Sequence, residues 1–295
     1  MKNKMIIASI VILLVMSVLS TGCIDDDDGE YDLRVAVTIP PQREWVEEIG
    51  GNGIKVTVMV PPGSDPHIYE PTSSQMVDVS EADIYFKVGA GMEFEKRWMD
   101  TLIEYNEEMV IIDGSKGVPL LDYDHEEHEN DHEGDDPHIW LSPVNAKIMI
   151  NNLLNALTEV DPDNSDIYNE NAADYLDRLD SLHEDVEESL HPYHERKFLI
   201  YHPSLNYFAH EYGLIQIGVE REGQEPGASG LEAVIEQAKE ENIRVVFVSP
   251  QFDESNARTI ADEIDGEVIT LNPLAENYIE NIEDITNKLG EAFGE

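Results

Sequence analysis

DPDNSDIYNENAADYLDRLDSLHEDVEESLHP, residues 161–192, has the periodicity of one long helix. Its apolar residues recur at spacings of three and four, which is typical of an amphipathic helix. They are Ala172, Tyr175, Leu176, Leu179, Leu182, Val186 and Leu190. Asp161-Pro162 suits an N-cap followed by a first helical residue, and no Gly or Pro interrupts the pattern until Pro192. Such a helix is roughly 40 Å long and stiff, so it disfavours wide hinge motion between the segments that it joins.

Short β-rich runs alternate with helical stretches on both sides of this segment. The strand candidates of the first half are Leu33–Ile39, Lys55–Val60, Asp83–Val88 and Met109–Ile112. Those of the second half are Lys197–Tyr201, Leu214–Gly218, Arg244–Val248 and Glu267–Thr270. Short apolar runs bounded by turn residues are typical of buried parallel strands. The sequence therefore predicts an α/β fold of two βα domains (32–160 and 193–295), with mostly parallel four-stranded sheets joined by a single long helix over 161–192.

The N-terminal segment has the pattern of an export signal. Basic residues precede an apolar run over 5–19, which is too short for a comfortable membrane span, and Ser-Thr-Gly-Cys follows at 20–23. The pattern predicts a signal peptide over 1–22, lipidation of Cys23 and an acidic tether over 23–31, although Ser20 stands where a lipobox usually has Leu. An ordinary signal peptide or an uncleaved anchor remain alternatives. Each reading places the remaining chain outside the cytoplasm, at the outer face of the membrane if Cys23 is its lipid anchor.

Composition excludes several classes of function. The chain has 63 acidic and 18 basic residues, a formal net charge of −45, which disfavours binding to nucleic acid and attracts cations. Most of these carboxylates are expected to form a solvated acidic surface, as in proteins adapted to high salt. Cys23 is the single cysteine, so neither an internal disulfide nor a cysteine-based zinc cluster can form. We expect a monomer.

Three of the ten histidines follow predicted strands. His67 and His138 each end an Asp-Pro-His tripeptide, and His202 comes directly after the first strand of the second half. In open α/β sheets, ligands bind beyond the carboxyl ends of the strands. Imidazoles from separate loops suit zinc, which favours nitrogen ligands in a tetrahedral shell. A metal site is therefore favoured narrowly over a small-molecule site, and a loop histidine can also be merely exposed.

Long motifs also carry a family resemblance. They are PPGSDPHIYEPTSSQ (61–75), DPHIWLSPVNAK (136–147), YHPSLNYFAHEYGL (201–214), GQEPGASGLEAVIEQ (223–237) and VFVSPQF (246–252). In this order they resemble the solute-binding proteins of zinc and manganese ABC importers, the ZnuA/TroA type. The resemblance covers essentially the whole chain after the N-terminal segment.

The resemblance implies a fold and a function. It implies that His67, His138 and His202 bind the metal between two βα domains joined by one helix, and that the partners are a permease and its ATPase. It also implies a binding protein and not an enzyme. Many manganese-type members carry Glu at the third position, so His202 favours Zn²⁺ as the transported ligand over Mn²⁺.

The fourth metal ligand is left open by the sequence. The family often supplies a carboxylate from the loop after the last strand, which here reads Leu-Asn-Pro-Leu-Ala-Glu over 271–276. Glu276 is the first candidate and Asn272 the second, and a three-histidine site closed by water is the alternative. Ser249 stands where a Glu is common, which predicts a missing partner around the site.

A loop rich in histidine and acids precedes His138. Residues 122–136, DYDHEEHENDHEGDD, contain His125, His128 and His132. Zinc-type members often carry such a loop, so one interpretation is weak capture of cations for delivery to the main site. The alternative is a solvated acidic loop.

The same sequence features are also compatible with three alternative functions. The same scaffold could carry Mn²⁺ or Fe²⁺, or serve as a metal-dependent surface adhesin. A zinc hydrolase is the remaining rival, and it requires an open coordination position and a general base.

Overall fold

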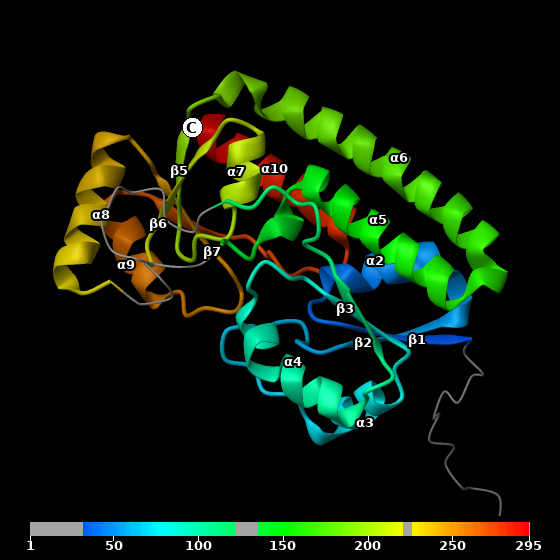
Figure 1. The fold of residues 1–295 in the computed structure, drawn as a ribbon. Coiled ribbons are helices and arrows are strands. Elements are labelled where there is room, and N and C mark those ends of the chain that lie inside the picture. Colours follow the sequence, from blue (N-terminus) through cyan, green and yellow to red (C-terminus); the bar gives the residue numbers. More distant parts are fainter. Residues whose placement is uncertain (1–31, 122–134, 221–225, 295) are drawn as a thin grey trace, which may run out of the picture. The chain divides into compact units, whose positions relative to one another are not determined.

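The computed structural model describes residues 32–121, 135–220 and 226–294 (Figure 1). Within them the chain forms two four-stranded sheets with the same strand pattern, ordered β2-β1-β3-β4 and β6-β5-β7-β8. Every strand pair is parallel. The predicted α/β fold with two four-stranded sheets is therefore confirmed, and all eight strands lie where the sequence places them, with their ends shifted by at most two residues.

The first sheet contains β1 (Leu33–Val37), β2 (Ile54–Val58), β3 (Ile84–Lys87) and β4 (Val110–Asp113). The second contains β5 (Lys197–Ile200), β6 (Ile215–Gly218), β7 (Val245–Val248) and β8 (Glu267–Thr270). The helices are α2 (Pro41–Gly50), α3 (Ser73–Ser80), α4 (Glu93–Tyr105), α5 (Pro143–Val160), α6 (Ser165–Leu190), α7 (Asn206–Glu211), α8 (Ala228–Glu240), α9 (Ser255–Glu263) and α10 (Tyr278–Gly294). None of the helices in the described ranges is long and apolar enough to span a membrane.

Helix α6 is the predicted connecting helix, with a corrected start. Residues Pro162–Asn164 form a 3-10 turn, and the α-helix begins only at Ser165. Asp161 was predicted to cap the helix, but its Oδ2 instead accepts hydrogen bonds from the Asn164 amide and the Tyr168 hydroxyl. These bonds hold the turn between α5 and α6, which pack side by side (Figure 1).

One hydrophobic core extends from the first sheet to the second. Strand β5 shows how, because its side chains alternate between the two faces of the sheet. Phe198 and Ile200 belong to the large core, which also contains residues of β1, α6 and α10. Leu199 and Tyr201 belong to a smaller core on the opposite face, with residues of α8 and α9. From Asp32 onward the chain forms one compact unit, and the domain boundaries at residues 160 and 193 stay a prediction.

A partly buried clasp ties helices from both halves together. Glu44 on α2 accepts hydrogen bonds from the Tyr175 hydroxyl on α6 and from the backbone N–H of Tyr278 at the start of α10. Beside it the rings of Trp45 and Tyr278 meet edge to face, with centroids 5.2 Å apart. The clasp fixes α10 of the second half against α2 of the first.

Several predictions concern residues outside the described ranges. The signal peptide over 1–22, the tether over 23–31 and Cys23 lie there, as do His125, His128 and His132. They stay predictions.

Replacing Glu44 should destabilise the protein measurably. In Glu44→Ala two partly buried donors lose their acceptor, so we expect the free energy of unfolding to fall by about 2–4 kcal/mol in urea denaturation. The matched control is Glu47→Ala on the exposed face of the same helix, which should change it by less than about 0.5 kcal/mol. Equal effects of the two substitutions would contradict the clasp.

Candidate metal centre

Two Asp-Pro-His turns present histidines from the first half of the chain. In each turn the Asp side chain accepts a hydrogen bond from the backbone N–H of the histidine two residues later. The bond from His67 to Asp65 is 2.8 Å long and that from His138 to Asp136 is 2.9 Å long. Such Asx turns are a local property of Asp, and the intervening proline restricts the backbone further. The sequence motif therefore fixes the local backbone conformation that precedes each of these two histidines.

The third histidine comes from the second half. His202 follows β5 by two residues and is only 3% exposed. The ring of Phe252, which follows β7, stacks on its imidazole with centroids 4.8 Å apart and an interplanar angle of 23°. Packing thus holds His202 in place from one face.

The structure brings the three predicted histidines together. One ligand nitrogen from each of His67, His138 and His202 lies within 4.8 Å of the other two. The Nε2 atoms of His138 and His202 are 3.3 Å apart. Their ring centroids are 5.2 Å apart, as are those of His67 and His202. Three imidazoles at these distances form a donor set that one metal ion can bridge.

A carboxylate lies at the Nδ1 atom of each histidine. Asp136 Oδ1 is 2.7 Å from His138 Nδ1, and Glu220 Oε2 is 2.9 Å from His202 Nδ1. A carboxylate accepts a hydrogen bond from Nδ1–H, and in this tautomer Nε2 carries the lone pair that can bind a metal ion. The pattern is that of carboxylate–histidine–metal triads, in which the outer carboxylate orients the ring and raises its basicity.

Helix α4 supports His67. Glu93, its first residue, places Oε2 2.8 Å from His67 Nδ1, at ion-pair distance but without the alignment of a hydrogen bond. Arg97, one turn later, donates to the backbone carbonyl of His67 at 3.1 Å. The side chain of His67 is 26% exposed, against 6% for His138 and 4% for His202. His67 is therefore the most exposed of the three histidines.

The surroundings shift the pKa values of two histidines in opposite directions. Burial disfavours the charged form of His67, yet the carboxylates of Glu93, Asp65 and Glu220 outweigh this and raise its pKa. Burial lowers the pKa of His202, and the neighbouring His138 and His67 lower it further against the opposing Glu220. His67 in turn lowers the pKa of Glu93 through their contact.

The histidines line a cavity of about 20 Å³, close to the volume of one water molecule. Its wall includes both prolines of the Asp-Pro-His turns, together with Met92, Trp140, Gln251, Phe252, Pro273 and Leu274. Such a volume suits a single ion better than an organic substrate. The cavity therefore favours a monatomic ligand over a small molecule.

Hydrogen bonds between the two halves surround this cavity. Trp140 Nε1 donates to the carbonyl of Pro273 at 2.8 Å, and the Tyr278 hydroxyl donates to the carbonyl of Trp140 at 2.7 Å. The Tyr207 hydroxyl donates to the carbonyl of Asp136 at 3.0 Å. These bonds fix the segment around His138 to the second half of the chain.

The structure does not place Glu276 with the histidines. Its carboxylate is 42% exposed and lies 3.7 Å from the Arg43 guanidinium, in a surface pocket with Glu44, Glu47, Glu48 and Asn277. The reason lies in the preceding turn, where the Trp140–Pro273 hydrogen bond and buried Leu274 face the cavity. Asn272 is engaged too, because its Oδ1 accepts from Gln251 Nε2 and from the backbone N–H of Leu274.

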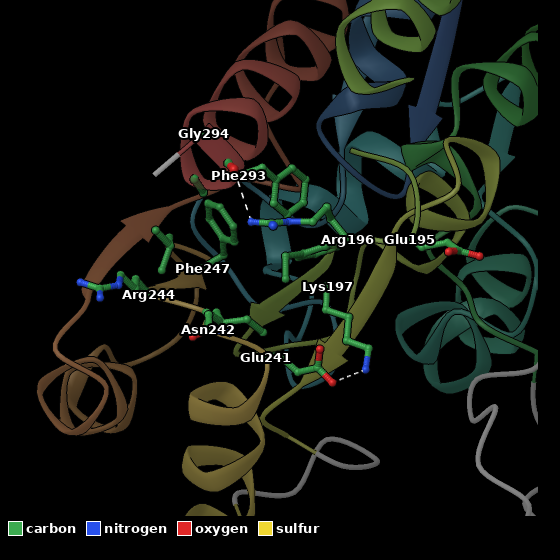
Figure 2. Close-up of a pocket in the computed structure, with 13 residues that line it drawn as sticks. Glu195, Arg196, Lys197, Glu241, Asn242, Arg244, Phe247, Phe293 and Gly294 are labelled. Carbon is green, nitrogen blue, oxygen red and sulfur yellow. Dashed lines mark hydrogen bonds and ion pairs between the residues drawn. The ribbon is translucent and has the colours of Figure 1, made fainter. Parts of the chain in front are cut away.

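A second pocket lies away from the histidines, at the amino ends of β5 and β7 (Figure 2). It measures about 560 Å³. Arg196 donates to the carbonyl of Phe293 and lies over the ring of that residue, and Lys197 pairs with Glu241. In Figure 2 these charged groups pair with their neighbours and do not converge on a common point. The pocket offers no group of metal ligands among the described residues.

Sequence reasoning missed the supporting carboxylates. Glu93, Asp136 and Glu220 are separated widely in the chain, and none forms a motif with its histidine except Asp136 in the Asp-Pro-His turn. One signal was available, because Glu93 and Glu220 both follow predicted parallel strands on the edge that carries the histidines. Ser249, predicted to leave a partner missing, is fully buried and its hydroxyl has no hydrogen-bond partner.

A solved structure and a family model identify the class to which this protein belongs. A crystal structure of ZnuA superposes with a TM-score of 0.82 at 40% identity, covering 88% of this chain and 98% of that one. The family model "Zinc-uptake complex component A periplasmic" matches residues 35–292. The chain belongs to this family, the solute-binding proteins of the ZnuA type, which are binding proteins and not enzymes.

Two curated relatives differ in the metal that they are named for. The manganese-binding lipoprotein MntA of Halalkalibacterium halodurans is 30% identical, with 88% of this chain and 87% of the relative aligned. The zinc-binding lipoprotein AdcA of Streptococcus pneumoniae is 27% identical over 99% of this chain. The chain spans 58% of the length of AdcA.

Removing one supporting carboxylate should shift a histidine titration. In Glu220→Gln the charge that favours protonated His202 is lost, so we expect the pKa of His202 to fall below its value in the parent protein. Titration of the imidazole Hε1 resonance by NMR on metal-free protein measures it. Exposed Glu236→Gln on α8 is the control, and an unchanged His202 titration in both variants would contradict the pairing.

Proposed function

We propose that this protein is an extracytoplasmic receptor that captures Zn²⁺ between the two halves of its chain and delivers it to an ABC permease. His67, His138 and His202 are the proposed ligands through their Nε2 atoms. The observation that carries the proposal is the convergence of these three imidazoles on an ion-sized cavity. The metal is cargo here, since family membership indicates a binding protein.

The donor set favours zinc over manganese. Three neutral imidazoles form a borderline set that suits Zn²⁺, whereas Mn²⁺ prefers carboxylate and water oxygens. The carboxylates at this site face Nδ1 atoms and so support the histidines. The names of AdcA and ZnuA support zinc, and the name of MntA supports manganese as the alternative cargo.

Membership in the family supports a proposed location and proposed partners. Residues 1–22 are proposed as a signal peptide and Cys23 as a lipid anchor, which the lipoprotein names of AdcA and MntA support. The proposed partners are a permease and its separate ATPase. The proposed domains are 32–160 and 193–295, with 161–192 as the connecting helix.

Calorimetric titration of the metal-stripped chain tests the cargo. We expect one tight site for Zn²⁺ and weaker binding of Mn²⁺. Loss of one ligand in His202→Ala should weaken zinc binding by more than about 100-fold, beyond the effect of losing an outer partner. His210→Ala on the exposed face of α7 is the matched histidine control and should bind as the parent does. Tighter Mn²⁺ than Zn²⁺ binding would refute the cargo, and no tight site for either ion would refute the receptor.

Zinc affinity should fall as the pH falls, because a protonated imidazole cannot bind metal. The pKa of His67 is raised above 6.5, so its proton competes first and the loss begins above pH 6.5. The pKa of His202 is lowered, so that ring stays neutral to lower pH. We expect about a tenfold loss per pH unit below the pKa of His67, steepening as further ligands protonate. Titrations from about pH 8 to about pH 5.5 measure it, and a flat profile would contradict histidine ligation.

A further inference from the structure

Gln251 lies at the histidine cavity, although its sequence motif did not mark it as a ligand. It follows β7 by three residues and lines the cavity beside the three imidazoles. A turn in which the backbone N–H of Phe252 donates to the carbonyl of Ser249 at 3.1 Å holds the segment. Phe252, the next residue, stacks on His202. The backbone around Gln251 is therefore fixed close to the proposed ligands.

The hydrogen bonds of Asn272 determine which way the Gln251 amide faces. The backbone N–H of Leu274 can only donate, and it lies 3.1 Å from the Asn272 side chain, so the atom there must be the acceptor Oδ1. The Gln251 atom 3.3 Å from that same oxygen must then be a donor, namely Nε2. The other end of the amide, Oε1, is left for a different partner.

That oxygen has no hydrogen-bond partner in the structure. Oε1 of Gln251 is buried and accepts no hydrogen bond. Among the described residues that line the histidine cavity, Gln251 is the only one with a buried, unpartnered side-chain nitrogen or oxygen. Burying an amide oxygen without a partner costs about 1–3 kcal/mol, so its retention beside an ion-sized cavity points to a ligand.

We propose that Oε1 of Gln251 is the fourth donor to the captured metal ion. The inference rests on the proposed function and replaces Glu276, Asn272 and water as candidates for that position. Three imidazole nitrogens and one amide oxygen complete a four-coordinate shell for Zn²⁺. Asn272 then acts as a positioning residue, because it holds Nε2 and so directs Oε1.

A coordination shell filled by four protein donors leaves no position for a water molecule. Hydrolytic zinc sites keep one position for a water molecule that the metal activates. With Gln251 in that position the bound ion has no activated water, which suits a receptor. The amide is also neutral, so it binds less strongly than a carboxylate would and leaves the charge of the ion to be balanced by Glu93, Asp136 and Glu220 through the imidazoles.

Cobalt spectroscopy tests the closed position in the unmodified protein. Co²⁺ bound at the site reports its coordination through visible absorption, and azide binds an open or water-filled position. We expect the spectrum of the parent protein to resist azide and that of Gln251→Leu to shift. We also expect Gln251→Leu to bind zinc about tenfold more weakly or worse, since one donor is lost. Gln237→Leu on the exposed face of α8 is the matched control and should behave as the parent.

A crystal structure of the zinc-loaded protein gives an independent reading. Oε1 should lie about 2.0–2.2 Å from the ion. Metal binding with an azide-sensitive parent spectrum, or with Oε1 outside coordination distance, would overturn this inference and leave the receptor proposal intact. An absence of tight metal binding would overturn both.

Discussion

The site depends on keeping three neighbouring imidazoles neutral and in one tautomer. Rings whose centroids lie 5.2 Å apart repel if more than one is charged. Carboxylates orient the rings of His138 and His202 through hydrogen bonds at Nδ1, and Glu93 lies 2.8 Å from Nδ1 of His67. The same carboxylates favour protonation, so burial has to oppose them. Burial prevails at His202, where the pKa is lowered, and the carboxylates prevail at the more exposed His67.

The geometry of this cluster is maintained by packing between the two halves. A core that runs from β1 to α10 leaves little freedom for the halves to separate, and the α6 connection adds stiffness. The hydrogen bonds of Trp140 and Tyr207 reach across from the segment that carries His138. Because packing holds the three histidines in place without an ion, the proposed binding of a metal requires little loss of conformational entropy.

Sequence reasoning recovered what local patterns encode. Strand positions follow from short apolar runs, and the Asp-Pro-His turns follow from side-chain hydrogen bonding within three residues. The start of α6 was placed too early. The Asp161 carboxylate accepts hydrogen bonds from the side chains of Asn164 and Tyr168 instead of capping the helix, and the sequence pattern could not decide between these two roles. Glu220 and Gln251 could not be assigned, since their roles depend on which loops meet at one edge of the sheets. The place of Glu276 could not be assigned either, because it depends on how the turn over residues 271–276 folds, and this turn places its carboxylate beside Arg43.

The overall charge and the site act at different ranges. A net charge of −45 attracts cations to the surface, but at physiological ionic strength exposed charges are screened beyond roughly 8 Å. It can therefore raise the encounter rate without distinguishing one divalent ion from another. Discrimination between divalent ions requires groups that are desolvated and fixed. At this site Asp136 and Glu220 are 1% and 6% exposed, and each is hydrogen-bonded to an imidazole. Under the proposed function, selectivity for zinc would therefore reside in these buried pairs, and the acidic surface would contribute only to the approach of the ion.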